Sequence, residues 1–94
     1  MSKSNPGIMT VELGKSDSVK KFVLPGATKS YTIKSRGNFA FQLAYMENGF
    51  DNGIFETVPA NFAVNEEDLS LTDPLIIWAK GEKANDILEV KIWR

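Results

Sequence analysis

The feature that most constrains the fold is an alternation of bulky apolar side chains between Asn38 and Met46. Successive side chains of an extended strand point to opposite faces, so one face of this stretch is aromatic and aliphatic. Its members are Phe39, Phe41, Leu43 and Tyr45. The other face is small or uncharged, with Ala40, Gln42, Ala44 and Met46. Since a water-exposed outer face normally carries polar residues, we predict a central strand whose second face is covered by another part of the protein.

Further short runs of alternating apolar and polar residues follow at a spacing of roughly ten residues. They predict strands over residues 9–13, up to 24, 31–34, 38–46, 54–58, 62–64, 75–80 and 87–93. Pro25-Gly26 and the Asn-Gly pairs of residues 47–53 favour turns between strands. A single helical turn is expected at residues 65–69, where a cap-like Asn precedes acids. The pattern indicates an all-β fold, an antiparallel β-sandwich or small barrel of seven to eight short strands.

The length of 94 residues suits one small domain. Residues 1–7 are polar and include Pro6 and Gly7, so we expect a flexible N-terminal arm followed by a single sandwich domain over residues 8–94. The opening residues contain no apolar run of the kind found in a secretory signal. No later stretch reaches the length of a membrane span. We therefore expect a soluble protein that is made in a cytoplasm and has no membrane partner.

The chain contains neither cysteine nor histidine. It therefore lacks thiolate chemistry, disulfides, the commonest general base and the commonest transition-metal ligand. Carboxylates occur at Glu47, Asp51, Glu56 and in the run 66–68, but no spacing selects an acid–base pair. Residues 47–51 offer oxygen ligands that suit Ca²⁺, although the Asn-Gly pairs in this region are explained as turns. We predict that the protein is not an enzyme and has no catalytic residue, metal site or cofactor.

The near-neutral total charge of -1 conceals an uneven distribution. Residues 1–46 carry seven Lys or Arg against two acids, a balance of +5, whereas residues 47–94 carry four bases against ten acids, a balance of -6. Interleaved strands could mix these charges across the surface. Alternatively, the molecule has a basic side and an acidic side, which would suit head-to-tail packing against copies of itself.

The last two predicted strands form a hairpin if residues 81–86 are its loop, with Trp78 opposite Glu89 and Ile76 opposite Lys91. One face of the hairpin is then uniformly apolar, with Leu75, Ile77, Ala79, Leu88, Val90 and Ile92. A register shifted by one residue would mix the faces, so this register is favoured. Both tryptophans then share the outer face, where Lys stems or a loop could cover them. We predict instead a protein interface, because exposed tryptophans mark such surfaces. Its residues are Ile76, Trp78, Glu89, Lys91 and Trp93.

Two stretches together resemble a known type of protein. They are the stop Val58-Pro59-Ala60 with an acidic turn before a Leu-rich strand, and the closing pair Leu75-Ile-Ile-Trp-Ala-Lys and Ile87-Leu-Glu-Val-Lys-Ile-Trp. From about Met9 onward the chain resembles the small all-β accessory proteins of tailed bacteriophage particles, which are encoded beside capsid and tail genes. The resemblance implies a structural role, in which the protein decorates a capsid or joins parts of a head or tail. It implies a location in the virion or host cytoplasm, and it carries over no residue-level site.

We therefore predict a non-catalytic structural or binding protein, a phage virion accessory component that docks on a capsid or tail assembly or self-associates. The first alternative is a carbohydrate-binding module that uses Trp78 and Trp93. The second is a single-stranded nucleic-acid-binding β-barrel, since several basic residues lie near aromatic ones that could stack on bases. The basic residues are Lys20, Lys21, Lys29, Lys34 and Arg36, and the aromatic ones are Tyr31, Phe39 and Phe41. The aromatic residues are also needed for the core, and the acidic half would repel phosphate.

Overall fold

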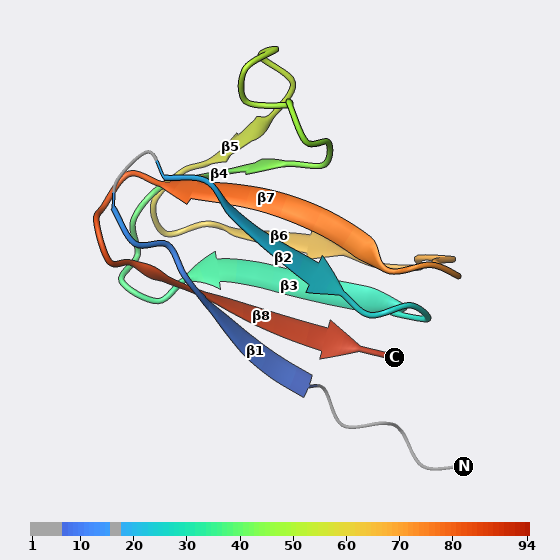
Figure 1. Cartoon of the computed structure of the whole chain (residues 1–94). Coiled ribbons are helices and arrows are strands. Elements are labelled where there is room, and N and C mark those ends of the chain that lie inside the picture. Colours follow the sequence, from blue (N-terminus) through green and yellow to red (C-terminus); the bar gives the residue numbers. More distant parts are fainter. Residues whose placement is uncertain (1–6, 16–17) are drawn as a thin grey trace.

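A computed structural model describes residues 7–15 and 18–94 as two four-stranded antiparallel sheets (Figure 1). The strands are β1 (Gly7–Glu12), β2 (Lys20–Leu24), β3 (Ser30–Ser35), β4 (Phe41–Ala44), β5 (Glu56–Val58), β6 (Ala63–Glu66), β7 (Leu75–Gly81) and β8 (Ile87–Trp93). The described residues form no helix, and hence none that could cross a bilayer. The prediction of an all-β antiparallel sandwich is confirmed. The predicted arm lies outside the described residues except for Gly7, which begins β1.

The two sheets have the strand orders β1-β8-β3-β6 and β2-β7-β4-β5, and we call them sheet A and sheet B. Among the described strands, β4 and β5 are the one pair of sequence neighbours that are also hydrogen-bonded neighbours. Every other connection crosses from one sheet to the other. This order is that of an eight-stranded jelly roll. In sheet A, β1 and β8 pair so that Gly7 lies opposite Ile92, which brings the two ends of the described chain together.

The core lies between the sheets and is filled by the apolar face of each strand. The side chains that are shielded almost completely from water include Leu13, Leu24, Ile33, Phe41, Leu43, Ile77, Leu88 and Val90. Full burial of one such side chain stabilises the fold by roughly 1.5–3 kcal/mol. The predicted inward faces of β7 and β8 are correct, since Ile77, Ala79, Leu88, Val90 and Ile92 are all buried.

The predicted hairpin between the last two strands is wrong, because β7 and β8 lie in different sheets. Strand β7 pairs with β2 and β4, so Trp78 lies opposite Lys21 and Ala44 and not opposite Glu89. Strand β8 pairs with β1 and β3, so Lys91 lies opposite Ile8 and Thr32. Alternation determines which side chains point inward but not which strand is the neighbour. The two apolar faces therefore meet across the core, and residues 82–86 span the roughly 10 Å between packed sheets.

The central strand predicted over residues 38–46 is confined to β4, Phe41–Ala44. Strand β4 is an interior strand of sheet B, and its Phe41 and Leu43 are buried as predicted. Phe39 and Tyr45, which were expected to share this core face, are 37% and 41% exposed. They lie beyond the ends of the strand, because Asn38 adopts a left-handed φ of 63° in a turn and the β4–β5 pairing spans three residues of β4.

Two further local predictions need correction. The expected helical turn at residues 65–69 is absent, since β6 extends to Glu66 and pairs with β3. The local preference of an Asn followed by acids for a helix start is weak. Here the edge of β3 offers backbone hydrogen bonds, and residues up to Glu66 pair with it instead. The expected strand at 54–58 is confined to its last three residues, because Ile54 and Phe55 belong to the preceding loop.

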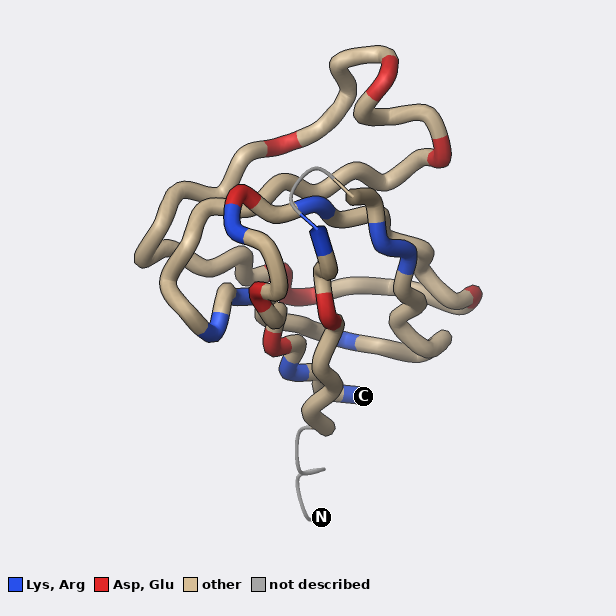
Figure 2. Tube along the Cα trace, turned by 60° about the vertical axis from the view of Figure 1, so that its left-hand side comes forward, with Lys and Arg blue, Asp and Glu red and all other residues tan. Residues whose placement is uncertain are grey.

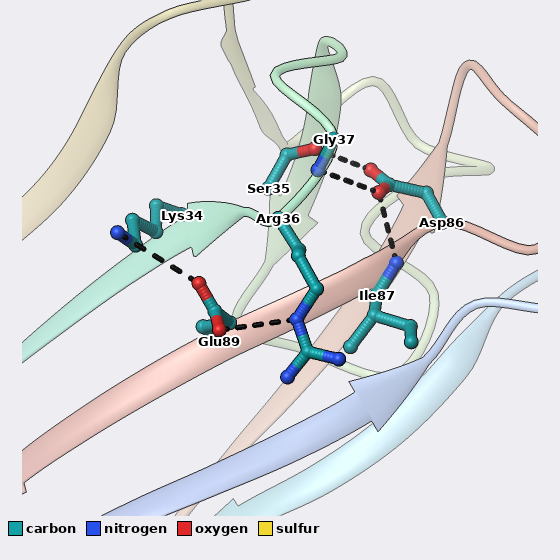
Figure 3. Close-up of polar contacts among 7 residues, drawn as sticks. All are labelled: Lys34, Ser35, Arg36, Gly37, Asp86, Ile87 and Glu89. Atoms are coloured by element: carbon teal, nitrogen blue, oxygen red, sulfur yellow. Dashed lines mark hydrogen bonds and ion pairs between the residues drawn. The ribbon is translucent and has the colours of Figure 1, made fainter.

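A buried polar contact holds the connection between β7 and β8 against the end of β3 (Figure 3). The Ser35 hydroxyl donates to Asp86 Oδ2 at 2.5 Å, and Asp86 Oδ1 accepts from the Ile87 amide at 2.8 Å and the Gly37 amide at 3.4 Å. The Phe39 amide donates to Ser35 Oγ at 2.9 Å. Ser35 and Asp86 are both buried, so the hydroxyl and the amides replace the water that would otherwise solvate the Asp86 carboxylate.

We predict that Asp86→Ala lowers the free energy of unfolding by about 2–3 kcal/mol, because it leaves the buried Ser35 hydroxyl and the Ile87 amide without their acceptor. Urea unfolding followed by tryptophan fluorescence measures the change. Glu82→Ala is the matched control, because Glu82 is exposed on the same connection and its loss should cost less than about 0.5 kcal/mol. Equal effects of the two changes would contradict a stabilising role for the buried carboxylate.

Candidate functional site

The five residues of the predicted interface do not share a surface. Ile76 and Trp78 lie on the outer face of sheet B, whereas Glu89, Lys91 and Trp93 lie on the outer face of sheet A. The prediction that both tryptophans share one surface is wrong, because β7 and β8 lie in different sheets. A sugar-binding site that uses both Trp78 and Trp93 would need their rings on one face, and they lie on opposite faces of the sandwich.

The charged residues on the outer face of sheet A are paired with one another (Figure 3). Glu89 contacts Lys34 at 3.7 Å and Arg36 at 3.1 Å, and the Lys91 ammonium lies 5.8 Å from the ring centroid of Trp93. Half-exposed ion pairs of this kind contribute about 0–1 kcal/mol each. Because Glu89 is shared by two basic residues, the group keeps a net positive charge. Of the three aromatic residues that the nucleic-acid alternative would use for stacking, Tyr31 and Phe41 are buried in the core and Phe39 is 37% exposed.

The loop between β4 and β5, residues 45–55, is the most prominent projection of the molecule (Figure 1). It folds on itself through backbone hydrogen bonds from Gly49 to Met46 at 3.0 Å and from Ile54 to Gly49 at 2.7 Å. The rings of Phe50 and Phe55 lie 5.5 Å apart between centroids, and the Lys80 ammonium lies 4.8 Å from the centroid of Phe50. The loop therefore has a small apolar centre of its own.

This loop covers part of the second face of the predicted strand 38–46. Of that face only Ala44 is buried, since Ala40 and Gln42 are half-buried and Met46 is 47% exposed. Ala44 on the outer face of β4 is fully buried, and a side-chain carbon added to Gly49 would lie 2.7 Å from the Ala44 methyl group. It would also lie 2.7 Å from the Ile54 carbonyl oxygen, which is backbone and cannot swing away. Residue 49 must therefore be glycine because the loop lies directly on the sheet.

Four large apolar side chains remain exposed on this loop and at the end of β4, with exposed fractions from 39% to 57%. We call them the tip cluster: Tyr45, Met46, Ile54 and Phe55. Together with Glu56 they line an open hollow of about 380 Å³. All four fall within strands predicted from the sequence, Tyr45 and Met46 in residues 38–46 and Ile54 and Phe55 in residues 54–58. A usable signal was that three large apolar residues, Phe50, Ile54 and Phe55, lie within or beside a stretch rich in Asn-Gly turns.

The tip cluster is tied to the core through hydroxyl groups. The Tyr45 hydroxyl lies 3.3 Å from that of the buried Tyr31, and it donates to Glu56 Oε1 at 3.2 Å. Burial raises the pKa of both phenols, and for Tyr45 the contact with Tyr31 and the nearby Glu56 carboxylate raise the pKa further. Both hydroxyls therefore stay protonated at neutral pH, so the Tyr45 ring is held in place with one side open to solvent.

No group of three or more acidic side chains is arranged to bind a metal ion within residues 7–15 and 18–94. The carboxylate–hydroxyl contact of Asp86 and Ser35 is buried, and the Asp86 carboxylate also accepts from the Gly37 and Ile87 amides, so this contact serves to hold the connection in place. Comparisons with protein-family models, curated proteins and solved structures find no match for this chain. The candidate site among the described residues is therefore the tip cluster, an exposed apolar surface on the β4–β5 loop.

We predict that Gly49→Ala destabilises the fold by about 1–3 kcal/mol, because the added methyl group overlaps the Ala44 methyl group and the Ile54 carbonyl. Gly53→Ala is the control, since Gly53 has open space around it and a left-handed φ of 72°. Its cost should be limited to about 1 kcal/mol of backbone strain. Urea unfolding compares the two. A cost for Gly49→Ala no greater than that for Gly53→Ala would contradict close packing of the loop on the sheet.

Proposed function

We propose that this protein is a non-catalytic structural protein that self-associates through the tip cluster, as an accessory component of a larger particle. The observation that supports this proposal is the exposure of four large apolar side chains at one place, on a loop whose backbone is internally bonded. Single exposed apolar residues are common, but contiguous apolar patches on a small domain mark interaction sites. Aromatic residues and Met are enriched in protein interfaces.

The tip cluster is suited to binding because little order has to be gained on contact. The Gly49 amide, the Phe50–Phe55 contact and the Tyr45 hydroxyl already hold the loop in one conformation. A preorganised surface avoids much of the entropy cost of association. A loop that served only as a connection between two antiparallel strands would need two to five residues rather than the eleven of residues 45–55.

The particle that the sequence resemblance implies is that of a tailed bacteriophage. Jelly rolls occur in viral capsid proteins, but also in lectins and cupins, so the fold is compatible with this part of the proposal without selecting it. The support for it remains the resemblance of the strands and turns from about Met9 onward.

We expect the protein to form an oligomer larger than the 10.4 kDa monomer, and the change Met46→Ser/Ile54→Ser to abolish it, while Phe55 is retained because it packs on Phe50 within the loop. Both side chains are exposed in the single chain, so their replacement removes apolar contact area without opening the core. Multi-angle light scattering over a range of concentrations measures the mass. Phe62→Ser is the matched control, because Phe62 is 65% exposed but lies on the β5–β6 connection, outside the tip cluster. A wild-type protein that is monomeric at all concentrations would overturn the proposal.

For the virion component, we expect the protein to travel with intact particles when a phage that encodes it is sedimented through a density gradient. Detection of the protein in gradient fractions by mass spectrometry provides the measurement. A non-structural phage protein is the control and should stay at the top of the gradient. Recovery of this protein in those same top fractions would contradict a place in the particle.

A further inference from the structure

The two edges of sheet B carry charges of opposite sign. Strand β2 forms one edge and exposes Lys20 and Lys21. Strand β5 forms the other edge, and it and the loop before it expose Glu47, Asp51 and Glu56. From residue 47 to residue 79 the chain has seven acids and no Lys or Arg. Figure 2 shows the result, with acidic positions on the projecting loop and at the start of β5, the strand that follows it, and no basic position among them. At the edges of sheet B the fold thus keeps apart the charges that the sequence divides between its halves, whereas on sheet A Lys34 and Arg36 pair with Glu89.

The basic edge also has an apolar surface. On the outer face of sheet B, Lys21 lies opposite Trp78 and Val23 lies opposite Ile76. We call these four residues the β2–β7 face. Val23 and Ile76 are 43% and 37% exposed, and Trp78 is partly exposed. This face contains the two residues of the sequence-predicted interface that lie on sheet B. Both this face and the tip cluster combine exposed apolar side chains with charged ones. The charge on the β2–β7 face is positive, and the charges beside the tip cluster are negative.

We infer that the tip cluster of one copy binds the β2–β7 face of a second copy. The inference rests on the proposed function and names its contact. Both surfaces are exposed in the single chain, so neither covers the other within one molecule. Between copies, the apolar residues of the tip cluster would cover Val23, Ile76 and Trp78, and Glu47 and Asp51 would come near Lys21. Lys20 faces the other way, over Gly14, and takes no part in the contact.

Electrostatics selects this pairing over the symmetric ones. A tip-to-tip contact would bring Glu47, Asp51 and Glu56 of each copy together, and a face-to-face contact would bring Lys21 of each copy together. Like charges placed opposite one another across an interface oppose association. Lysines on an edge strand normally prevent association, but they do so against other basic edges and not against an acidic surface. The two surfaces are therefore complementary to each other and not to themselves.

A contact between two different surfaces has a geometric consequence. Each copy that binds through its tip cluster still presents a free β2–β7 face, so a third copy can add in the same way. Such head-to-tail contacts produce a ring if the rotation between copies closes and a filament if it does not.

Two charge-reversal variants test the inference by light scattering. Lys21→Glu makes the β2–β7 face acidic like the tip, and Glu47→Lys/Asp51→Lys makes the tip basic while retaining Glu56, which holds Tyr45. We expect each variant alone to be monomeric, and an equimolar mixture to recover the wild-type mass with the two variants in a 1:1 ratio. Glu66→Lys/Glu67→Lys is the matched control, since it reverses two exposed acids near β6 and should leave the mass unchanged.

The outcomes separate the inference from the proposed function. If both variants alone keep the wild-type oligomer while Met46→Ser/Ile54→Ser loses it, the tip cluster binds another surface and the inference is overturned, although the proposed function stands. If the mixture stays monomeric, the inference is also overturned. A wild-type protein that is itself monomeric at every concentration overturns both. A wild-type oligomer that weakens as salt rises from about 0.05 M to about 1 M supports the charged contact.

Discussion

The packing of one apolar face of each sheet against the other is the interaction on which the whole structure depends. The chain has no cysteine to form a disulfide, so burial of side chains such as Ile33, Leu43, Ile77 and Val90 must supply most of the stability. A slip of one residue in any strand would turn its apolar side chains outward and bury its polar ones. The period-two pattern therefore fixes the register, and the register in turn fixes what is left on the surface.

The existence and facing of most strands could be predicted from the sequence, but their neighbours could not. The residues of β7 and β8 alternate so clearly that their inward faces were predicted correctly, yet a hairpin and a crossing between sheets satisfy the same alternation. The choice depends on contacts with β2 and β3, which are far away in sequence. The segment at residues 65–69 shows the same effect, because the free edge of β3 outweighs its local preference for a helical turn.

The tip cluster could not be predicted from the sequence, because it lies where the periodic pattern ends. The alternation places Tyr45 and Met46 in the predicted strand of residues 38–46, and Ile54 and Phe55 in the predicted strand of residues 54–58. Asn-Gly pairs predict where the chain turns and not whether the turns close into a packed loop. That closure depends on the contact of Gly49 with Ala44. The charge division, by contrast, is visible in the sequence. The topology keeps it at the two edges of sheet B, whereas sheet A brings Lys34 and Arg36 of the first half next to Glu89 of the second.

The pairing of Gly7 with Ile92 has a consequence for how the molecule can be attached to something else. The start of β1 and the end of β8 leave the sandwich side by side, at the end remote from the β4–β5 loop (Figure 1). Any peptide fused before β1 or after β8 would emerge there, away from the tip cluster. The sandwich can thus carry a passenger at either terminus, and a short linker between these ends would permit circular permutation with the chain opened elsewhere.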